Sequence, residues 1–243
     1  MKLKAIFSNL ALATALSAVA LSAAPAFAAG KMTVSSPQDP GSWDPIDTFL
    51  VNWASVATNI YDGLVYRGPD LKIVPALATS WEELDEGKRI RFHLRENVKF
   101  HNGEDFNAEA VKFTFERLLG EEGGKGPQRS NYVAIDKVEV IDDKTVDLHL
   151  KDTDPVLMIK LAGYGAMIVP PKYIQEKGDE FFNANPVGTG PFKVTSYKPK
   201  VGIRWKRLLT IGAAHQSFPS SNIASSANRQ RLLLNCRPVA LIS

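Results

Sequence analysis

Two hydrophobic periods follow one another in the middle of the chain, and together they limit it to a mixed architecture. Over residues 89–95 apolar and charged side chains alternate, which is the period of a strand with one dry face. Over residues 107–119 the apolar side chains recur every three or four positions behind the N-cap residue Asn107, which is typical of an amphipathic helix. Segments 135–141 and 145–150 alternate again and predict a second hairpin. The pattern also predicts a short strand at 31–35, a helix over 48–61 and a loop at 120–126. The sequence therefore predicts an α+β fold.

The first 30 residues have the pattern of a secretory signal peptide. Lys2 and Lys4 precede an apolar run rich in Ala and Leu, and Ala26-Phe27-Ala28 forms a small-x-small cleavage pattern. We expect a signal peptide at residues 1–28 and a periplasmic protein. The alternative, an N-terminal membrane anchor, is disfavoured because the apolar run is short. Since the first cysteine is Cys236, we expect neither a lipid anchor nor a disulfide framework.

The net charge of +3 hides two basic ends. Residues 1–30 hold two lysines, residues 204–243 hold six basic side chains, and neither segment holds an acid. Removing these eight from the 29 basic residues leaves 21 against 26 acids, a net charge of −5 for the part between. This distribution argues against nucleic acid as a partner.

Three motifs carry a family resemblance. The segment 91–115 reads RFHLRENVKFHNGEDFNAEAVKFTF, PALATSW precedes it at 75–81, and NPVGTGPF follows at 185–192. They resemble the family 5 solute-binding proteins, which bind oligopeptides, dipeptides, nickel complexes and related solutes for ABC importers. The resemblance implies a two-lobed periplasmic-binding-protein-like fold that closes around its ligand at a hinge. It also implies a small peptide or related solute as ligand, an importer permease as partner, a monomer, and no cofactor.

The resemblance extends over residues 31–203, so we expect residues 29–203 to form an incomplete first lobe and the second lobe to be missing. Residues 204–243 hold six serines and show no amphipathic period, which a disordered basic tail would explain. A frameshift is the alternative that we favour. Codons can be chosen such that reading from the third base of codon 204 gives LEAAADYWGGAPKLSKL, which looks like the family's continuation after its GTGPF strand.

Ligand contacts of a two-lobed binder are expected on loops that face its cleft. Aromatic rings there can stack on a solute, and carboxylates can pair with its amine. For each candidate the alternative is core packing or helix capping, and we expect Trp53 to be a core residue. The seven candidates are in the first loop, near the end of the first helix and between two glycines: Trp43, Asp44, Asp47, Asn59, Tyr61, Asp62 and Tyr164.

Neither a metal site nor an enzyme is predicted. His101, Glu104 and Asp105 fall within five positions, but such a group is more typical of a solvated turn than of a metal site. The chain carries no catalytic signature such as H-E-x-x-H or G-x-S-x-G. Three alternatives to a solute receptor stay open: a fragment that binds nothing, an exported peptide hydrolase, and a chaperone-like binder of unfolded peptide.

Overall fold

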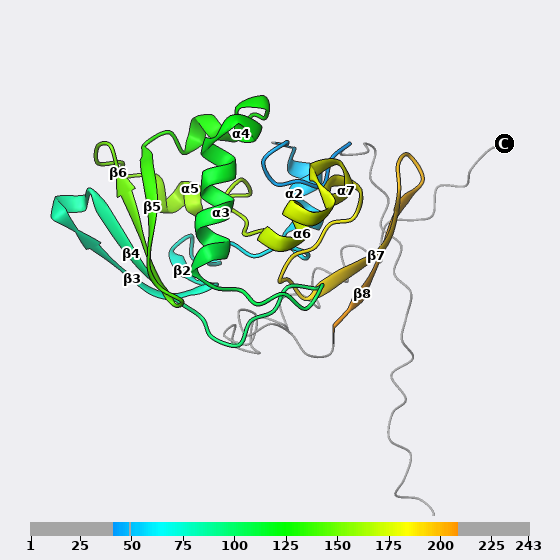
Figure 1. The fold of residues 1–243 in the computed structure, drawn as a ribbon, viewed down its shortest axis with the longest axis horizontal. Coiled ribbons are helices and arrows are strands. Elements are labelled where there is room, and N and C mark those ends of the chain that lie inside the picture. Colours follow the sequence, from blue (N-terminus) through cyan, green and yellow to red (C-terminus); the bar gives the residue numbers. More distant parts are fainter. Residues whose placement is uncertain (1–40, 49, 209–243) are drawn as a thin grey trace, which may run out of the picture. The chain divides into compact units, whose positions relative to one another are not determined.

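The computed structural model describes residues 41–48 and 50–208, within which the largest sheet has four antiparallel strands (Figure 1). The strands follow the order β3-β4-β6-β5, and the 3-10 turn η1 (Asp85–Gly87) joins the first two. Both predicted hairpins are present, and pairing of β4 with β6 joins them. The strands are β3 (Ala78–Leu84), β4 (Arg89–Leu94), β5 (Ile135–Asp142) and β6 (Thr145–Leu150).

Helix α3 (Ala108–Leu119) covers one face of this sheet (Figure 1). The side-chain oxygen of Asn107 accepts a hydrogen bond from the N–H of Ala110 at 3.1 Å, so the predicted N-cap is confirmed. Phe115 and the strand residue Phe92 are both fully buried in one core. Each buried side chain of this size contributes about 1.5–3 kcal/mol. Burial of the apolar stripe of α3 against the apolar face of the strands therefore stabilises the helix on the sheet.

The other face of the sheet is charged. Alternate residues of a strand point to opposite faces, so the side chains of Arg89 and Arg91 of β4 lie on the face of the sheet that Phe92 does not use. Arg91 Nε donates to Asp147 Oδ1 at 2.7 Å and Arg91 Nη2 to Oδ2 at 2.8 Å, while Arg89 Nη1 donates to Oδ2 at 2.9 Å. The two arginines thereby cover Asp147, which is 1% exposed.

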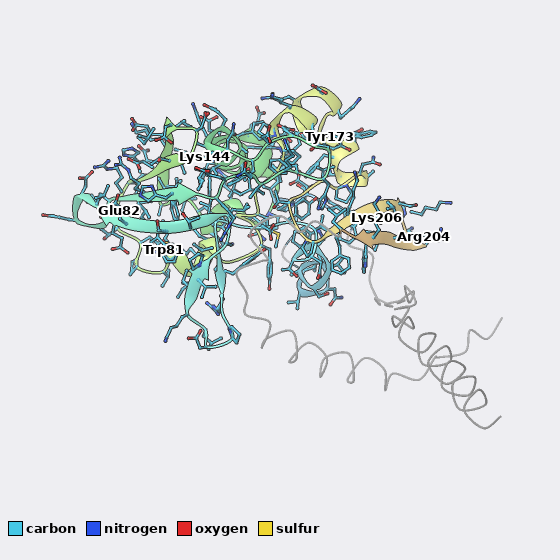
Figure 2. All side chains as sticks on the ribbon, turned by 90° about the horizontal axis from the view of Figure 1, so that it is seen from below. Trp81, Glu82, Lys144, Tyr173, Arg204 and Lys206 are labelled. Carbon is cyan, nitrogen blue, oxygen red and sulfur yellow. The ribbon has the colours of Figure 1, made fainter. Side chains whose placement is uncertain are left out.

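Outside the four-stranded sheet and α3, hereafter the sheet module, the described residues form two small hairpins and several short helices. Strands β1 (Val65–Arg67) and β2 (Ile73–Pro75) form a small hairpin, and so do β7 (Phe192–Lys198) and β8 (Gly202–Arg207). Figure 2 shows Arg204 and Lys206 extending from β8, and both are exposed. The helices and the second 3-10 turn are α2 (Val51–Ala57), α4 (Glu121–Lys125), η2 (Arg129–Asn131), α5 (Leu157–Leu161), α6 (Pro171–Lys177) and α7 (Asp179–Ala184).

Several boundaries differ from the sequence pattern. The first helix, expected over 48–61, is limited to α2, because Leu50 is still extended (φ −83°, ψ 129°). Segment 120–126, expected as a loop, contains α4. Strand β8 continues four residues past the expected domain end at residue 203. The signal peptide, the expected strand at 31–35 and residues 209–243 lie outside the described residues, and the domain limits remain predictions.

The segment Gly188-Thr189-Gly190, hereafter the crossover, runs directly against the backbone that follows α2. The N–H of Gly190 donates to the carbonyl of Ile60 at 2.9 Å. A Cβ atom on Gly188 would lie 2.1 Å from the Ile60 carbonyl oxygen, so a side chain cannot fit there. The motif that resembles the family is thus a determinant of the fold, since it brings β7 beside the end of α2.

Candidate functional site

The first loop, residues 41–48, is fixed by a buried carboxylate. Asp44 is fully buried and binds Arg117 of α3, which also binds Asp179 at the start of α7. The N–H of Ile46 donates to Asp44 Oδ1 at 3.2 Å. Burial raises the pKa of Asp44 even though the Arg117 guanidinium acts in the opposite direction. These contacts connect the loop to two helices and hold its shape.

The aromatic rings of two candidates, Tyr61 and Tyr164, pack against Trp53. Tyr61 stacks on Trp53 with ring centroids 6.5 Å apart, and its hydroxyl donates to the carbonyl of Trp43 at 3.0 Å. Tyr164 contacts Trp53 edge-on, also at 6.5 Å. Trp43, Trp53 and Tyr61 are buried, with at most 2% exposure, so the expectation that Trp53 is a core residue is confirmed. The structure therefore brings the rings of Tyr61 and Tyr164 together at Trp53, while the ring of Trp43 packs edge-on against Tyr197 with the centroids 5.6 Å apart.

Asp62 lies in a second buried group, at the crossover. Its carboxylate accepts hydrogen bonds from the hydroxyl of Tyr66 and, at 2.7 Å, from the hydroxyl of Thr189. Asp62 and Thr189 are buried, and burial raises the pKa of Tyr66 well above its usual range. Asp62 is thus bound by groups of the lobe itself.

Three of the seven candidates keep accessible side chains. Asp47 is exposed and accepts a hydrogen bond from the hydroxyl of Ser42 at 2.7 Å. Tyr164 is half-buried, and Asn59, two residues past the end of α2, is exposed, with its amide donating to the carbonyl of Ser55 at 3.0 Å. Gln128 links the first loop to the segment of Tyr164, because its side chain donates to the carbonyl of Thr48 at 2.6 Å and lies against Gly165. The carbonyl of Asn59 accepts the N–H of Phe192, just after the crossover.

Sequence reasoning missed Arg117 and Gln128, which hold this region together. Their partners are 73 and 80 residues away in the chain, so no local pattern could have identified them. The one signal available was that Arg117 would lie near the end of a strongly periodic helix. Its burial follows only from the packing of α3 against the first loop and α7.

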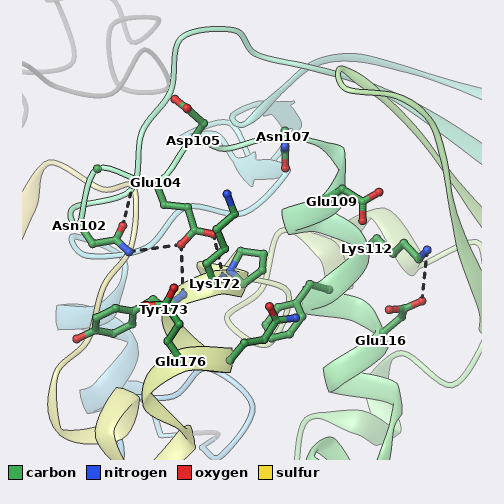
Figure 3. Close-up of a pocket in the computed structure, with 14 residues that line it drawn as sticks. Asn102, Glu104, Asp105, Asn107, Glu109, Lys112, Glu116, Lys172, Tyr173 and Glu176 are labelled. Atoms are coloured by element: carbon green, nitrogen blue, oxygen red, sulfur yellow. Dashed lines mark hydrogen bonds and ion pairs between the residues drawn. The ribbon is translucent and has the colours of Figure 1, made fainter.

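A groove of about 780 Å³ lies between α3, α6 and the turn before α3 (Figure 3). Glu104 accepts hydrogen bonds from the N–H groups of Lys172, at 3.0 Å, and Tyr173, at 3.4 Å. Lys112 pairs with Glu116 at 4.0 Å. None of the seven candidates lines this groove, whose charged walls are formed by Glu104, Asp105, Glu109, Lys112, Glu116, Lys172 and Glu176.

Within residues 41–48 and 50–208, no three His, Cys, Asp or Glu side chains are grouped as a metal ion would require. Across the same residues, every helix is too short or too polar to cross a membrane.

The lobe has the fold of periplasmic binding proteins of the peptide-binding type. It superposes on the dipeptide binding protein from Pseudoalteromonas sp. SM9913 in complex with Met-Leu, with a TM-score of 0.66, 25% identity, and coverage of 70% of this chain and 38% of that chain. It also superposes on the PBP AgaA from A.tumefacien R10 in complex with agropinic acid, with a TM-score of 0.64, 34% identity, and coverage of 70% and 34%. The α+β class and the one-lobe architecture are thereby confirmed.

The family follows from the sequence match. Residues 72–208, more than half of the 243-residue chain, match the bacterial extracellular solute-binding proteins, family 5 Middle, and the chain belongs to this family. Di/tripeptide-binding protein 1 of Pseudomonas aeruginosa (strain UCBPP-PA14) is 30% identical, over 85% of this chain and 42% of its own length. The chain thus spans about two fifths of the length of this curated relative.

Proposed function

We propose that this chain is the solute-binding component of an ABC importer for short peptides or related small solutes. The observation that carries the proposal is the family match over residues 72–208, in a lobe whose fold is shared with a dipeptide-binding protein. Because AgaA binds agropinic acid, the proposal includes small solutes other than peptides. The protein would act without a cofactor, as a monomer in the periplasm after removal of residues 1–28, with an importer permease as its partner.

We place the solute contacts of this lobe at Asp47 and Tyr164, with Asn59 at the far end of α2. Their accessible carboxylate, phenol and amide groups can pair with the amine, ring or carbonyl groups of a short peptide. The other four candidates, Trp43, Asp44, Tyr61 and Asp62, are buried and would act by fixing the backbone that carries the accessible three.

An energetic feature supports this location. Within the described residues, the indole N–H groups of Trp43 and Trp53 are buried without a hydrogen-bond acceptor. A buried donor of this kind costs about 1–3 kcal/mol, and such costs are found where function rather than stability decides the structure. Both indoles lie in the first loop and α2. Among the described residues, one further buried polar atom without a partner, Asn183 Oδ1, lies in α7, and none lies in the four-stranded sheet.

Calorimetric titration of the purified, processed protein with di- and tripeptides tests the proposal. We expect saturable binding that Asp47→Asn and Tyr164→Ala each weaken at least about five-fold, the effect of one lost contact of about 1 kcal/mol. Glu82→Gln, on the exposed side of β3, is the matched control and should leave binding unchanged. Absence of binding by a protein with an intact near-UV spectrum would favour the fragment that binds nothing, and cleaved peptide would favour the hydrolase.

We further propose that residues 204–243 are read in a shifted frame. The supporting observation is the continuation LEAAADYWGGAPKLSKL that suitable codons permit. Sequencing the gene across and beyond codon 204 tests this directly, and a gene without that reading would contradict it.

Mass spectrometry of the exported protein tests the proposed signal peptide, because the mature chain should begin at Ala29.

A further inference from the structure

His101 is a buried histidine whose two ring nitrogens both face the crossover. The residue is 9% exposed. Its Nε2 lies 2.7 Å from the carbonyl oxygen of Gly190, and its Nδ1 lies 3.4 Å from the backbone nitrogen of Gly188. A carbonyl can only accept and a backbone N–H can only donate, so Nε2 carries the proton and Nδ1 accepts. The crossover therefore holds the ring in one neutral tautomer.

A second proton would have to bind at Nδ1, where it would face the N–H of Gly188. Protonation would replace a hydrogen bond by two opposed donors and would place a positive charge in a buried site. Burial lowers the pKa of His101 from its usual value of 6.5, in spite of the hydrogen bond to Gly190. The neutral ring and the closed crossover consequently stabilise each other.

The charged groups near His101 do not provide a ready partner for a second proton. Lys193 of β7 donates to the His101 carbonyl at 2.7 Å and opposes a positive ring. Asp62, beyond α2, favours a positive ring, but its carboxylate accepts the Thr189 hydroxyl at 2.7 Å. Glu104, in the same turn as His101, is bound to the start of α6 (Figure 3). Its neighbour Asp105 pairs with Lys99.

The crossover is also the point where three segments are joined by backbone hydrogen bonds. The N–H of His101 donates to the carbonyl of Gly188 at 2.9 Å, and the N–H of Gly190 donates to the carbonyl of Ile60 at 2.9 Å. The N–H of Phe192, at the start of β7, donates to the carbonyl of Asn59 at 3.0 Å. Loss of the hydrogen bond between the His101 ring and the N–H of Gly188 therefore loosens the end of α2 and the start of β7 together.

We propose that His101 makes the crossover acid-sensitive: protonation at Nδ1 breaks the contact with Gly188 and opens the junction between the His101 turn, the end of α2 and β7. This regulation is independent of the proposed function, because it depends only on contacts inside the lobe. The sign follows from linkage. Because the pKa of His101 is lowered in the folded state, the unfolded or opened state binds more protons, and the closed state loses stability as the pH falls below 6.5.

Amide hydrogen exchange of the full chain, followed by NMR between pH 7.5 and pH 5 and corrected for intrinsic exchange, tests the proposal. We expect the opening constant of the Gly190 and Phe192 amides to rise below pH 6.5 by up to about ten-fold per pH unit, the limit for one proton. His101→Gln keeps a donor and an acceptor but cannot titrate, so its opening constant should stay level. His93→Gln, at an exposed position on β4, should keep the wild-type rise.

The imidazole ¹⁵N shifts of the wild-type chain give a second measurement that needs no variant. We expect the Nε2–H tautomer at pH 7.5 and titration of His101 below pH 6.5. Equal opening constants of wild type and His101→Gln across the range would overturn the proposal. If that variant does not fold, the wild-type ring alone decides, and titration at or above pH 6.5 overturns it.

Discussion

Asp147 and Asp44 are both buried carboxylates bound by arginine, but they belong to two regions that are built in different ways. Asp147 lies on the sheet and is covered by Arg91 and Arg89, and the hydrogen bond from Arg91 lowers its pKa. Asp44 lies in the first loop, where burial raises its pKa although Arg117 is bound to it. Pairing therefore outweighs desolvation on the sheet, and desolvation outweighs pairing in the loop.

The difference reflects how each partner is supplied. Arg91 is directly opposite Asp147 in the β4–β6 register, so formation of the sheet brings them together. Arg117 reaches Asp44 only after α3, the first loop and α7 have packed together. The region that carries the proposed solute contacts thus depends on long-range packing, whereas the sheet module obtains its charge pairs from neighbouring strands.

Replacement of Arg117 by Met should have the largest effect on stability. It leaves Asp44 buried without its cation, and breaking a buried pair costs about 3–5 kcal/mol. Urea unfolding followed by circular dichroism measures this loss. Lys112→Met on the same helix is the control, because its pair with Glu116 is exposed and should contribute less than about 1 kcal/mol. A loss no larger than that of the control would show that the first loop is not held by the buried pair.

Asp147→Asn should have a smaller effect, about 2 kcal/mol at pH 7, because two half-exposed arginines lose their charged acceptor. Water can still reach the two arginines in Asp147→Asn, whereas it cannot reach the buried carboxylate of Asp44 in Arg117→Met. Asp85→Asn is the matched control, because that carboxylate binds the same Arg89 from an exposed position. If the two variants have equal unfolding midpoints in urea, the burial of Asp147 does not matter and the comparison fails.

The dependence of stability on pH in acid should reveal the lowered pKa of Asp147. The pKa of Asp147 is lowered from 3.8 in the folded state, so its contribution is fully present above pH 3.8 and is lost as the pH falls through the folded value. Thermal unfolding between pH 5 and pH 2 should therefore show a shallower decline for Asp147→Asn than for wild type. Parallel curves would contradict the lowered pKa.

Asn107→Ala should have the smallest effect, about 1 kcal/mol, because it removes one helix cap from α3. Since the cap belongs to the sheet module, the loss should be the same with and without Arg117→Met, within about 0.5 kcal/mol. Asn107→Ser retains a capping oxygen and is the control. Coupling well above that value in a double-mutant cycle would mean that the two regions do not respond separately.

The sheet module was largely predictable because its signals are local. Alternation gave both hairpins, and Asn107 with its apolar stripe gave α3. The ends of α2 and the helical character of α4 were not predictable, since periodicity does not locate the ends of short helices. Of the candidate site, the sequence identified Tyr61 and Tyr164, whose rings the structure brings together at Trp53.

By itself, the sequence determined the α+β class and the family, because these depend on short-range periods and on local motifs. Only the tertiary structure decided which candidate side chains stay accessible. Asp44 and Asp47 are three positions apart in one loop, yet the first is buried against Arg117 and the second is exposed. The physical reason is that burial depends on partners distant in the chain, which no local pattern contains.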